Sequence, residues 1–171
     1  MDLTFKTESG IFNYRVCAVI KHNSKLLAMK NNLSPYYYLP GGRVNLHESA
    51  ENAIIRELKE ELGIKGNVVR PLWLAQQFFV EDVSKEKFHE LCIYYLVDVS
   101  DTYLINKNCF AGLETNQNEF FEWLDICSLN EQYLYPLFIK EKINDIPENL
   151  EILTEYEYRD NWGLSPVVPN R

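Results

Sequence analysis

The amino-acid sequence predicts a single α/β domain, folded as an α/β sandwich. Segments rich in aromatic and β-branched residues precede and follow a central amphipathic helix, and a further strand and a second helix come later in the chain. The length of 171 residues suits one domain with its own hydrophobic core. We therefore expect one domain over residues 1–158 and an extended tail over residues 159–171.

A hairpin is predicted near the start of the chain. Residues 12–21 (FNYRVCAVIK) should form a strand, because aromatic and β-branched side chains pack well on a pleated sheet. Residues 22–24 (HNS) have the composition of a turn, and residues 25–30 return as a second strand. A loop over residues 31–35 then leads into three extended tyrosines at residues 36–38.

A rigid turn and the central helix follow. Residues 39–42 (LPGG) join a proline of fixed φ to two glycines, so the backbone there can approach a ligand closely. Beyond this turn, apolar side chains recur with a period near 3.6 residues, which predicts a helix with one apolar side. These side chains are Ile54, Ile55, Leu58 and Leu62. Gly63 should end the helix in the left-handed conformation.

Two strands are predicted after the helix. Residues 66–80 form a long apolar run that Pro71 interrupts, so this strand should be irregular there or lie at a sheet edge. Residues 90–99 (ELCIYYLVDV) form the clearest strand and should pair with it as a hairpin. We expect His89 and Glu90 to be polar residues at the edge of the connecting loop; the alternative places them near a metal or a phosphate.

The last third of the chain reads as mixed structure. Residues 100–118 are expected to be a long irregular loop, and residues 119–124 (EFFEWL) a short strand. Pro136 suits the first turn of a second helix that runs to about residue 144. Residues 150–158 are expected to form the final strand.

Composition narrows the class of protein. The net charge of −8 argues against a stable nucleic-acid complex, which needs clustered Lys and Arg. No apolar run is long enough to span a membrane, and the N-terminus lacks the pattern of a signal peptide, so we expect a cytoplasmic protein. The four cysteines form no CxxC pair, and three of them are expected to be buried thiols. They are Cys17, Cys92, Cys109 and Cys127.

Three glutamates on the central helix point to a metal. Glu57, Glu60 and Glu61 lie at positions i, i+3 and i+4, so they should project from one side of the helix. Like charges at this spacing repel one another, and a hard divalent cation would neutralise them because carboxylate oxygens are its preferred ligands. The alternative is a solvated, glutamate-rich helix surface.

The stretch from residue 42 to residue 64 (GRVNLHESAENAIIRELKEELGI) resembles the signature of the Nudix hydrolase family. That signature is Gly, five residues, Glu, seven residues, Arg-Glu, an aliphatic residue, any residue, Glu-Glu, any residue, Gly and an aliphatic residue. The matching positions are Gly42, Glu48, Arg56, Glu57, Leu58, Glu60, Glu61, Gly63 and Ile64, with no departure. A chance match of this length is on the order of one in ten million or rarer.

The resemblance implies a mixed sheet between helices, with the signature forming a loop-helix-loop. It also implies that Glu57, Glu60 and Glu61 bind Mg²⁺, with Mn²⁺ as the alternative metal and the carbonyl of Gly42 as a further ligand. By the same resemblance, Glu48 and Arg56 would hold the carboxylates in place through ion pairs.

Family members often recruit an acid from outside the signature. Glu119 is the first candidate here and Glu122 the second; Glu61 and Glu90 also remain open as the general base. The reaction implied is hydrolysis of a nucleoside diphosphate linked to another moiety, where bound metal would activate water.

The substrate stays open at this level. Val80 stands where ADP-ribose hydrolases tend to carry proline and dinucleoside polyphosphate hydrolases tyrosine, so both assignments lose support, whereas clearance of modified nucleoside triphosphates remains open. The candidates for stacking on a base are Tyr36, Phe78 and Phe79, and those for contacting phosphate are Arg15 and Arg43.

Two expectations concern partners. Some Nudix-like domains act without hydrolysis, as nucleotide or metabolite sensors or as protein-interaction modules, but these usually have damaged carboxylate clusters, whereas this cluster is intact. A hydrolase acting on a small nucleotide is therefore the favoured prediction. The aromatic and proline residues of the tail, together with the acidic surface, lead us to expect a homodimer.

Overall fold

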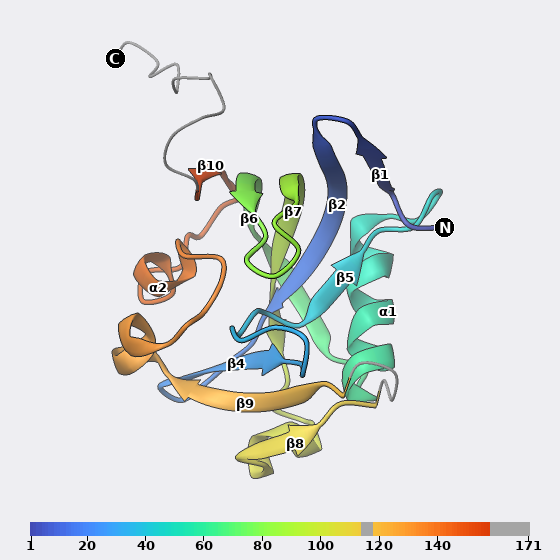
Figure 1. The fold of residues 1–171 in the computed structure, drawn as a ribbon. Coiled ribbons are helices and arrows are strands. Elements are labelled where there is room, and N and C mark those ends of the chain that lie inside the picture. Colours follow the sequence, from blue (N-terminus) through green and yellow to red (C-terminus); the bar gives the residue numbers. More distant parts are fainter. Residues whose placement is uncertain (114–117, 158–171) are drawn as a thin grey trace.

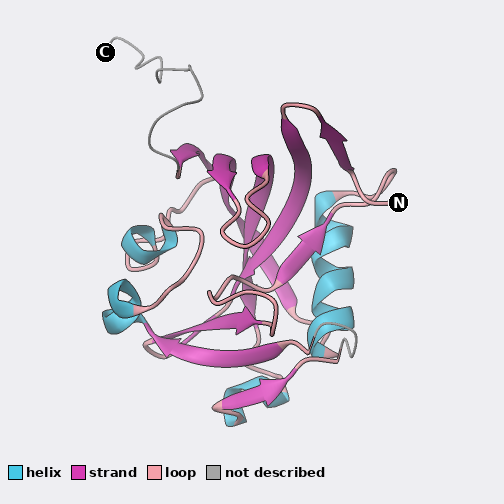
Figure 2. Cartoon of the chain, in the orientation of Figure 1, coloured by secondary structure: helices cyan, strands magenta, loops and turns pink. Residues whose placement is uncertain are grey.

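The computed structural model describes residues 1–113 and 118–157, so the expected tail over residues 159–171 lies outside the described residues. Two β-sheets pack with one long helix and several short helical segments (Figure 1 and Figure 2).

The strands of the six-stranded sheet are β1 (Thr4–Thr7), β2 (Gly10–Val19), β5 (Gly41–Arg43), β6 (Asn67–Val80), β7 (Lys87–Asp98) and β10 (Glu151–Tyr156). Those of the four-stranded sheet are β3 (Lys21–His22), β4 (Lys25–Lys30), β8 (Cys109–Ala111) and β9 (Phe120–Asp125). The helices are α1 (Ala50–Leu62) and α2 (Ile139–Lys142), and two 3₁₀ segments cover Tyr103–Asn106 and Ile126–Glu131.

The first sheet is mixed, as expected. Its order is β1-β2-β7-β6-β10, with β5 paired to β2. The pairs β2–β7 and β6–β10 are parallel, and the others are antiparallel. The second sheet runs β3-β4-β9-β8 and is antiparallel throughout.

The ends of α1 are set by local sequence. The side chain of Ser49 accepts a hydrogen bond from the backbone N–H of Asn52 and so caps the first turn. Gly63 ends the helix at φ 66°, which confirms the predicted left-handed terminator.

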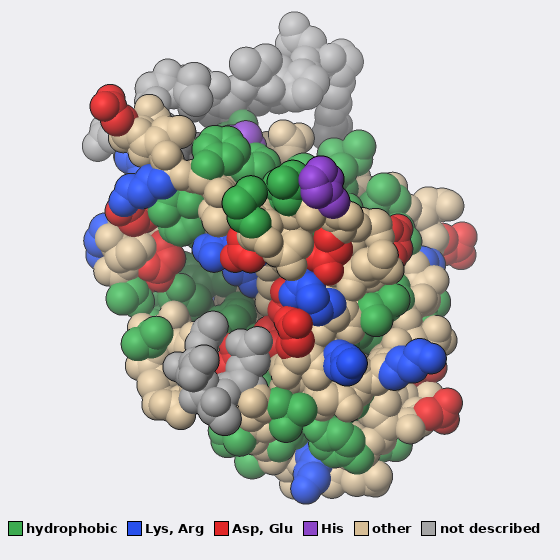
Figure 3. Space-filling view, turned by 90° about the vertical axis from the view of Figure 1, so that its right-hand side faces the viewer, with side chains coloured by type: hydrophobic (Ala, Val, Ile, Leu, Met, Phe, Trp, Pro, Cys, Tyr) green, Lys and Arg blue, Asp and Glu red, His purple; other side chains and the backbone are tan. Residues whose placement is uncertain are grey.

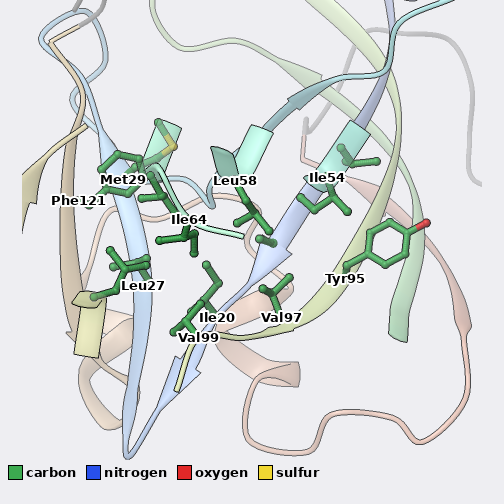
Figure 4. Packing of buried hydrophobic residues seen from close by; sticks show 14 of the residues in the cluster. Ile20, Leu27, Met29, Ile54, Leu58, Ile64, Tyr95, Val97, Val99 and Phe121 are labelled. Carbon is green, nitrogen blue, oxygen red and sulfur yellow. The ribbon is translucent and has the colours of Figure 1, made fainter. Parts of the chain in front are cut away.

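The inner side of α1 packs on the mixed sheet. Ile54 and Leu58 point from the helix into a core that also holds Val97 of β7 (Figure 4). Ile55 was expected on the same apolar stripe, but it is 44% exposed, because it lies beyond the edge of the surface that faces the sheet. The apolar stripe of α1 is therefore narrower than the sequence pattern indicates.

Successive residues of β2 face two different cores. Val16 and Ala18 belong to the core beneath α1, whereas Cys17 and Val19 belong to a second core that includes Ile139 of α2. With helical segments on both sides of the sheets, the predicted α/β sandwich is confirmed.

The strand predicted to begin at residue 90 begins at Lys87. His89 and Glu90 therefore lie inside β7, and their predicted place at a loop edge is wrong. The strand is longer because it pairs on both sides: His89 lies opposite Phe12 of β2 and Phe78 of β6. Pairing partners so distant in sequence leave no local signal.

Other predictions need smaller corrections. The expected long loop over residues 100–118 contains a 3₁₀ segment and β8, and the second helix is shorter than predicted. The irregularity predicted near Pro71 is confirmed, since the register of β6 against β7 shifts there, and β10 pairs with β6 only from Trp73 onward. Two cysteines are buried instead of three, since Cys109 and Cys127 are exposed. Within the described residues, no helix is long and apolar enough to cross a membrane.

Candidate active site

A cavity of about 570 Å³ lies where α1, β2, β5, β6 and β7 meet. Most of the predicted site residues line it. They are Arg15, Tyr36, Gly42, Arg43, Glu57, Glu60, Glu61, Phe79 and Glu119. Acidic and basic side chains lie next to one another on the side of the molecule that carries α1 (Figure 3).

Four predicted residues do not line the cavity: Glu48 and Arg56, which lie behind it, and Phe78 and Glu122. Phe78 is on the opposite side of the sheet, where its ring stacks on those of His89 and Tyr156 at centroid distances of 4.4 and 5.0 Å. Glu122 accepts a hydrogen bond of 2.7 Å from the hydroxyl of Tyr37. Because Glu122 does not line the cavity, Glu119 is the better placed of the two acids.

Glu61 is the most deeply buried carboxylate of α1, with 4% of the residue exposed. It accepts a hydrogen bond of 3.0 Å from the backbone N–H of Gly41, in the glycine turn. Burial raises the pKa of Glu61 well above its usual range, and repulsion from Glu57 and Glu119 raises it further. Three carboxyl groups thus share one poorly hydrated space.

Glu57 lies directly against the glycine turn. A Cβ at position 42 would lie 2.2 Å from Oε1 of Glu57, so only glycine leaves room for this carboxylate. Burial raises the pKa of Glu57, although the adjacent guanidinium of Arg56 opposes the shift.

Arg56 binds three carboxylates from behind the cavity. Its Nε and Nη2 donate to the two oxygens of Glu48 at 2.8 and 2.9 Å, and its Nη1 donates to Glu57 at 2.6 Å and to Glu60 at 3.0 Å. Nη2 also donates to the carbonyl of Arg43 at 2.9 Å, which ties α1 to β5. Hydrogen bonds from Arg56 lower the pKa of Glu48 to about 2.

Glu60 differs from its two neighbours on α1. Its side chain is 45% exposed, against 11% for Glu57. The helix places Glu57 and Glu61 one turn apart over the cavity, and Glu60 at its rim. The three carboxylates therefore share a side of α1, but only two of them are buried.

The donor set fits a hard divalent cation. Carboxylate oxygens of Glu57, Glu61 and Glu119 line the same cavity, and their mutual repulsion would be relieved by bound positive charge. Among the described residues, no three acidic, His or Cys side chains already converge on one point. This openness suits Mg²⁺, which retains several waters and takes few protein carboxylates together with substrate phosphates.

In another part of the cavity wall, tyrosine hydroxyls donate hydrogen bonds to acidic side chains. The hydroxyl of Tyr36 donates to Glu81 at 2.6 Å, and that of Tyr135 donates to Asp82 at 3.2 Å. The ring of Tyr36 meets that of Tyr135 edge-on at 5.2 Å. These contacts link the β6–β7 loop to the segment before β5 and to the segment before α2.

The sheet supplies a polar floor that the sequence analysis missed. Gln77 and Asn13 are 3% and 2% exposed, and both line the cavity with Glu90. Nδ2 of Asn13 donates to Glu90 at 3.3 Å, and Nε of Arg15 lies 4.0 Å from Glu90. One signal was present: Gln76 and Gln77 interrupt an otherwise apolar run in β6, and one of them had to face a polar space.

Arg15 connects this floor to the glycine turn. Its Nη2 donates to the carbonyl of Gly41 at 3.1 Å, and the N–H of Gly41 donates to Glu61. Among the described residues, the guanidinium of Arg15 makes this one hydrogen bond to the backbone, from Nη2. Because the side chain lines the cavity, its other N–H groups can donate to an anion there.

Comparison with known proteins identifies relatives of most of the chain. A model of the NUDIX domain matches residues 12–146. The chain is 29% identical over 110 residues to the ADP-ribose pyrophosphatase of Methanocaldococcus jannaschii, covering 63% of this chain and 60% of that protein. It is 24% identical over 126 residues to the mRNA-decapping protein D10 of Fowlpox virus, covering 70% and 54%. The chain thus spans 60% and 54% of the lengths of these two relatives.

A solved structure shares the architecture. The NUDIX hydrolase from Nitrosomonas europaea superposes with a TM-score of 0.58 at 14% identity, covering 88% of this chain and 81% of that chain. At this identity the likeness concerns the fold alone.

Proposed function

The chain belongs to the Nudix family, and we propose that it is a metal-dependent pyrophosphohydrolase that cleaves a nucleoside diphosphate linked to another moiety. The supporting observation is the grouping of Glu57, Glu61 and Glu119 with Arg15 around one cavity. The relatives named as pyrophosphatase and decapping protein support the same class of bond, a phosphoric anhydride.

We assign the metal site to Glu57, Glu60 and Glu61, with the carbonyl of Gly42 as a further ligand. When bound there, Mg²⁺ or Mn²⁺ would neutralise the diphosphate and lower the pKa of a bound water. Arg56 donates hydrogen bonds to both Glu57 and Glu48, and so orients these carboxylates before the substrate binds.

The remaining groups bind and orient the substrate. Arg15 and Arg43 line the cavity beside the glycine turn, where their guanidinium groups can donate to phosphate oxygens. Glu119 enters the cavity from the start of β9, opposite α1, and is the residue we assign to accept a proton from the attacking water. Tyr36 and Phe79 form the aromatic part of the wall against which a base can pack.

The test is a panel of nucleoside diphosphate derivatives with and without Mg²⁺, run in ¹⁸O water with identification of the products. We expect metal-dependent release of a nucleoside monophosphate, with the label revealing the phosphorus that is attacked. Tight binding of nucleotides with no turnover on any derivative would instead indicate a sensor, the alternative that the intact carboxylate cluster disfavours.

A further inference from the structure

A side-chain donor that makes no hydrogen bond among the described residues lies on the floor of the cavity. Gln77 is 3% exposed, and its Oε1 accepts a hydrogen bond of 2.7 Å from the hydroxyl of Tyr94. Within the described part of the chain, Nε2 of Gln77 makes no hydrogen bond, although the residue lines the cavity. This amide N–H can therefore donate to a ligand that enters the cavity.

An acceptor lies beside this donor. Gln77 of β6 and Glu90 of β7 are directly opposite in the antiparallel register, which places their Cβ atoms about 4.5–5.5 Å apart. Oε2 of Glu90 accepts a hydrogen bond from the amide of Asn13 and faces Arg15. Burial raises the pKa of Glu90, and the positive charge of Arg15 and the bond from Asn13 oppose this shift. Among the described residues, Oε1 of Glu90 makes no hydrogen bond, so it too can serve a ligand.

We propose that Gln77 and Glu90 form a base-recognition subsite that selects guanine. The edge of guanine presents the acceptor O6 beside two donors, N1–H and N2–H₂. An amide N–H of Gln77 can donate to O6, while the carboxylate of Glu90 accepts from N1–H and N2–H₂ together.

Other bases match this pair less well. Adenine would bring the lone pair of N1 against the carboxylate of Glu90, and cytosine would bring N3 and O2 there, so both leave the acid facing an acceptor. Uracil offers a single donor. A site with buried polar groups rejects a ligand that leaves them unpaired more strongly than a plain apolar pocket does.

The placement suits a nucleotide, and the inference rests on the proposed function. Arg15 lies between Glu90 and the glycine turn, because its Nε faces Glu90 and its Nη2 donates to the carbonyl of Gly41. The backbone N–H of Gly41 in turn donates to Glu61. A nucleotide with its base on the floor therefore directs its phosphates towards the glycine turn and α1. The cavity volume of about 570 Å³ is in the range of small-molecule sites.

Equilibrium binding of GMP, IMP, AMP and CMP in the presence of Mg²⁺ tests the proposal without any turnover. We expect GMP to bind about 10-fold more tightly than IMP, which lacks the amino group, and about 10- to 100-fold more tightly than AMP or CMP. Equal affinities for the four nucleotides, or no binding of any, would overturn the proposal.

Two variants test whether Gln77 and Glu90 produce the preference for guanine. Glu90→Gln should weaken GMP by about 10- to 100-fold and AMP by far less, and Gln77→Met should weaken GMP by about 10-fold. Gln76→Met, on the opposite side of the same strand, is the matched control and should keep the preference. Thermal unfolding checks that each variant folds. If the guanine preference persists in either Glu90→Gln or Gln77→Met, that residue is not the one that reads the base.

The binding and hydrolysis experiments can fail separately. A guanine preference in binding without turnover on any diphosphate derivative would retain this subsite and reject the hydrolase. Equal turnover of substrates with different bases would retain the hydrolase and reject the guanine subsite.

Discussion

Gly42 and Glu57 are in such close contact that a single methyl group at position 42 would lie 2.2 Å from Oε1 of Glu57. The glycine turn and α1 are therefore fitted to each other through a carboxylate of the proposed metal site. The same turn contacts the second buried carboxylate, because the N–H of Gly41 donates to Glu61. The turn thus positions both acids before any ligand binds.

Gly42→Ala should impair catalysis more than stability. The added methyl group meets the flexible end of the Glu57 side chain, so this carboxylate must move while the backbone stays. Gly41→Ala should instead reduce stability, because Gly41 has φ of 141° and its Cβ would lie 2.2 Å from the carbonyl oxygen of Val16. Mg²⁺-dependent turnover and urea unfolding of both variants distinguish the two effects. The opposite ranking would contradict this account of the turn.

Glu61→Gln should separate metal binding from folding. Without metal, the variant should be at least as stable as the wild type, because a neutral amide costs less to bury and does not repel Glu57 and Glu119. Mg²⁺ should raise the melting temperature of the wild type and not that of the variant. Turnover should fall by at least about 100-fold.

The matched control is Glu86→Gln, a half-buried carboxylate that pairs with Lys6 outside the cavity. It should retain both the melting shift and the turnover. If Mg²⁺ raised the melting temperature of Glu61→Gln as much as that of the wild type, Glu61 would have no part in the metal site.

Arg56→Lys should destabilise the fold although the charge is kept. An ammonium group cannot reproduce the paired bonds to Glu48 together with those to Glu57 and the carbonyl of Arg43. We expect a loss of about 2–4 kcal/mol in the free energy of unfolding, measured with urea. Lys59→Arg, at an exposed position of the same helix, should be neutral. A loss below that of the control would show that the ion pairs are dispensable.

Glu48→Gln should destabilise the protein in a pH-dependent way. The pKa of Glu48 falls from 4.5 to about 2 on folding, so its contribution is fully present above pH 4.5 and is lost as the pH falls towards 2. The difference in unfolding free energy between wild type and variant should therefore be larger at pH 7 than at pH 3. Glu8→Gln, at an exposed turn position, provides the comparison. A difference that grew on acidification would refute the ion pair as its source.

Much of the site could be predicted from the sequence because its key contacts are local. Glu57 and Glu61 are separated by one helical turn, and Gly63 ends that helix through its own backbone conformation. The apolar runs of β6 and β7 likewise predicted a hairpin, which the structure confirms. The irregularity of β6 near Pro71 could also be predicted, because proline has no backbone N–H to donate to a neighbouring strand.

The errors have a common physical origin. The three glutamates share one side of α1 as expected, but the sequence did not show that Glu60 is more exposed than Glu57, because the packing of α1 on the sheet decides this. Glu90 was placed at a loop edge because nothing near it in sequence shows that β7 pairs with β2. Phe78 and Phe79 could not be separated until the side of the sheet that faces the cavity was known.

The sequence by itself determined the helix that carries the carboxylates and the glycine turn against which they pack, since both depend on residues close together along the chain. Only the tertiary structure decided that Asn13, Gln77 and Glu90 meet on the floor of one cavity. The pairing of β2, β7 and β6 brings these residues together. Such pairing is set by the burial of whole strands, and a stretch read alone does not contain that information.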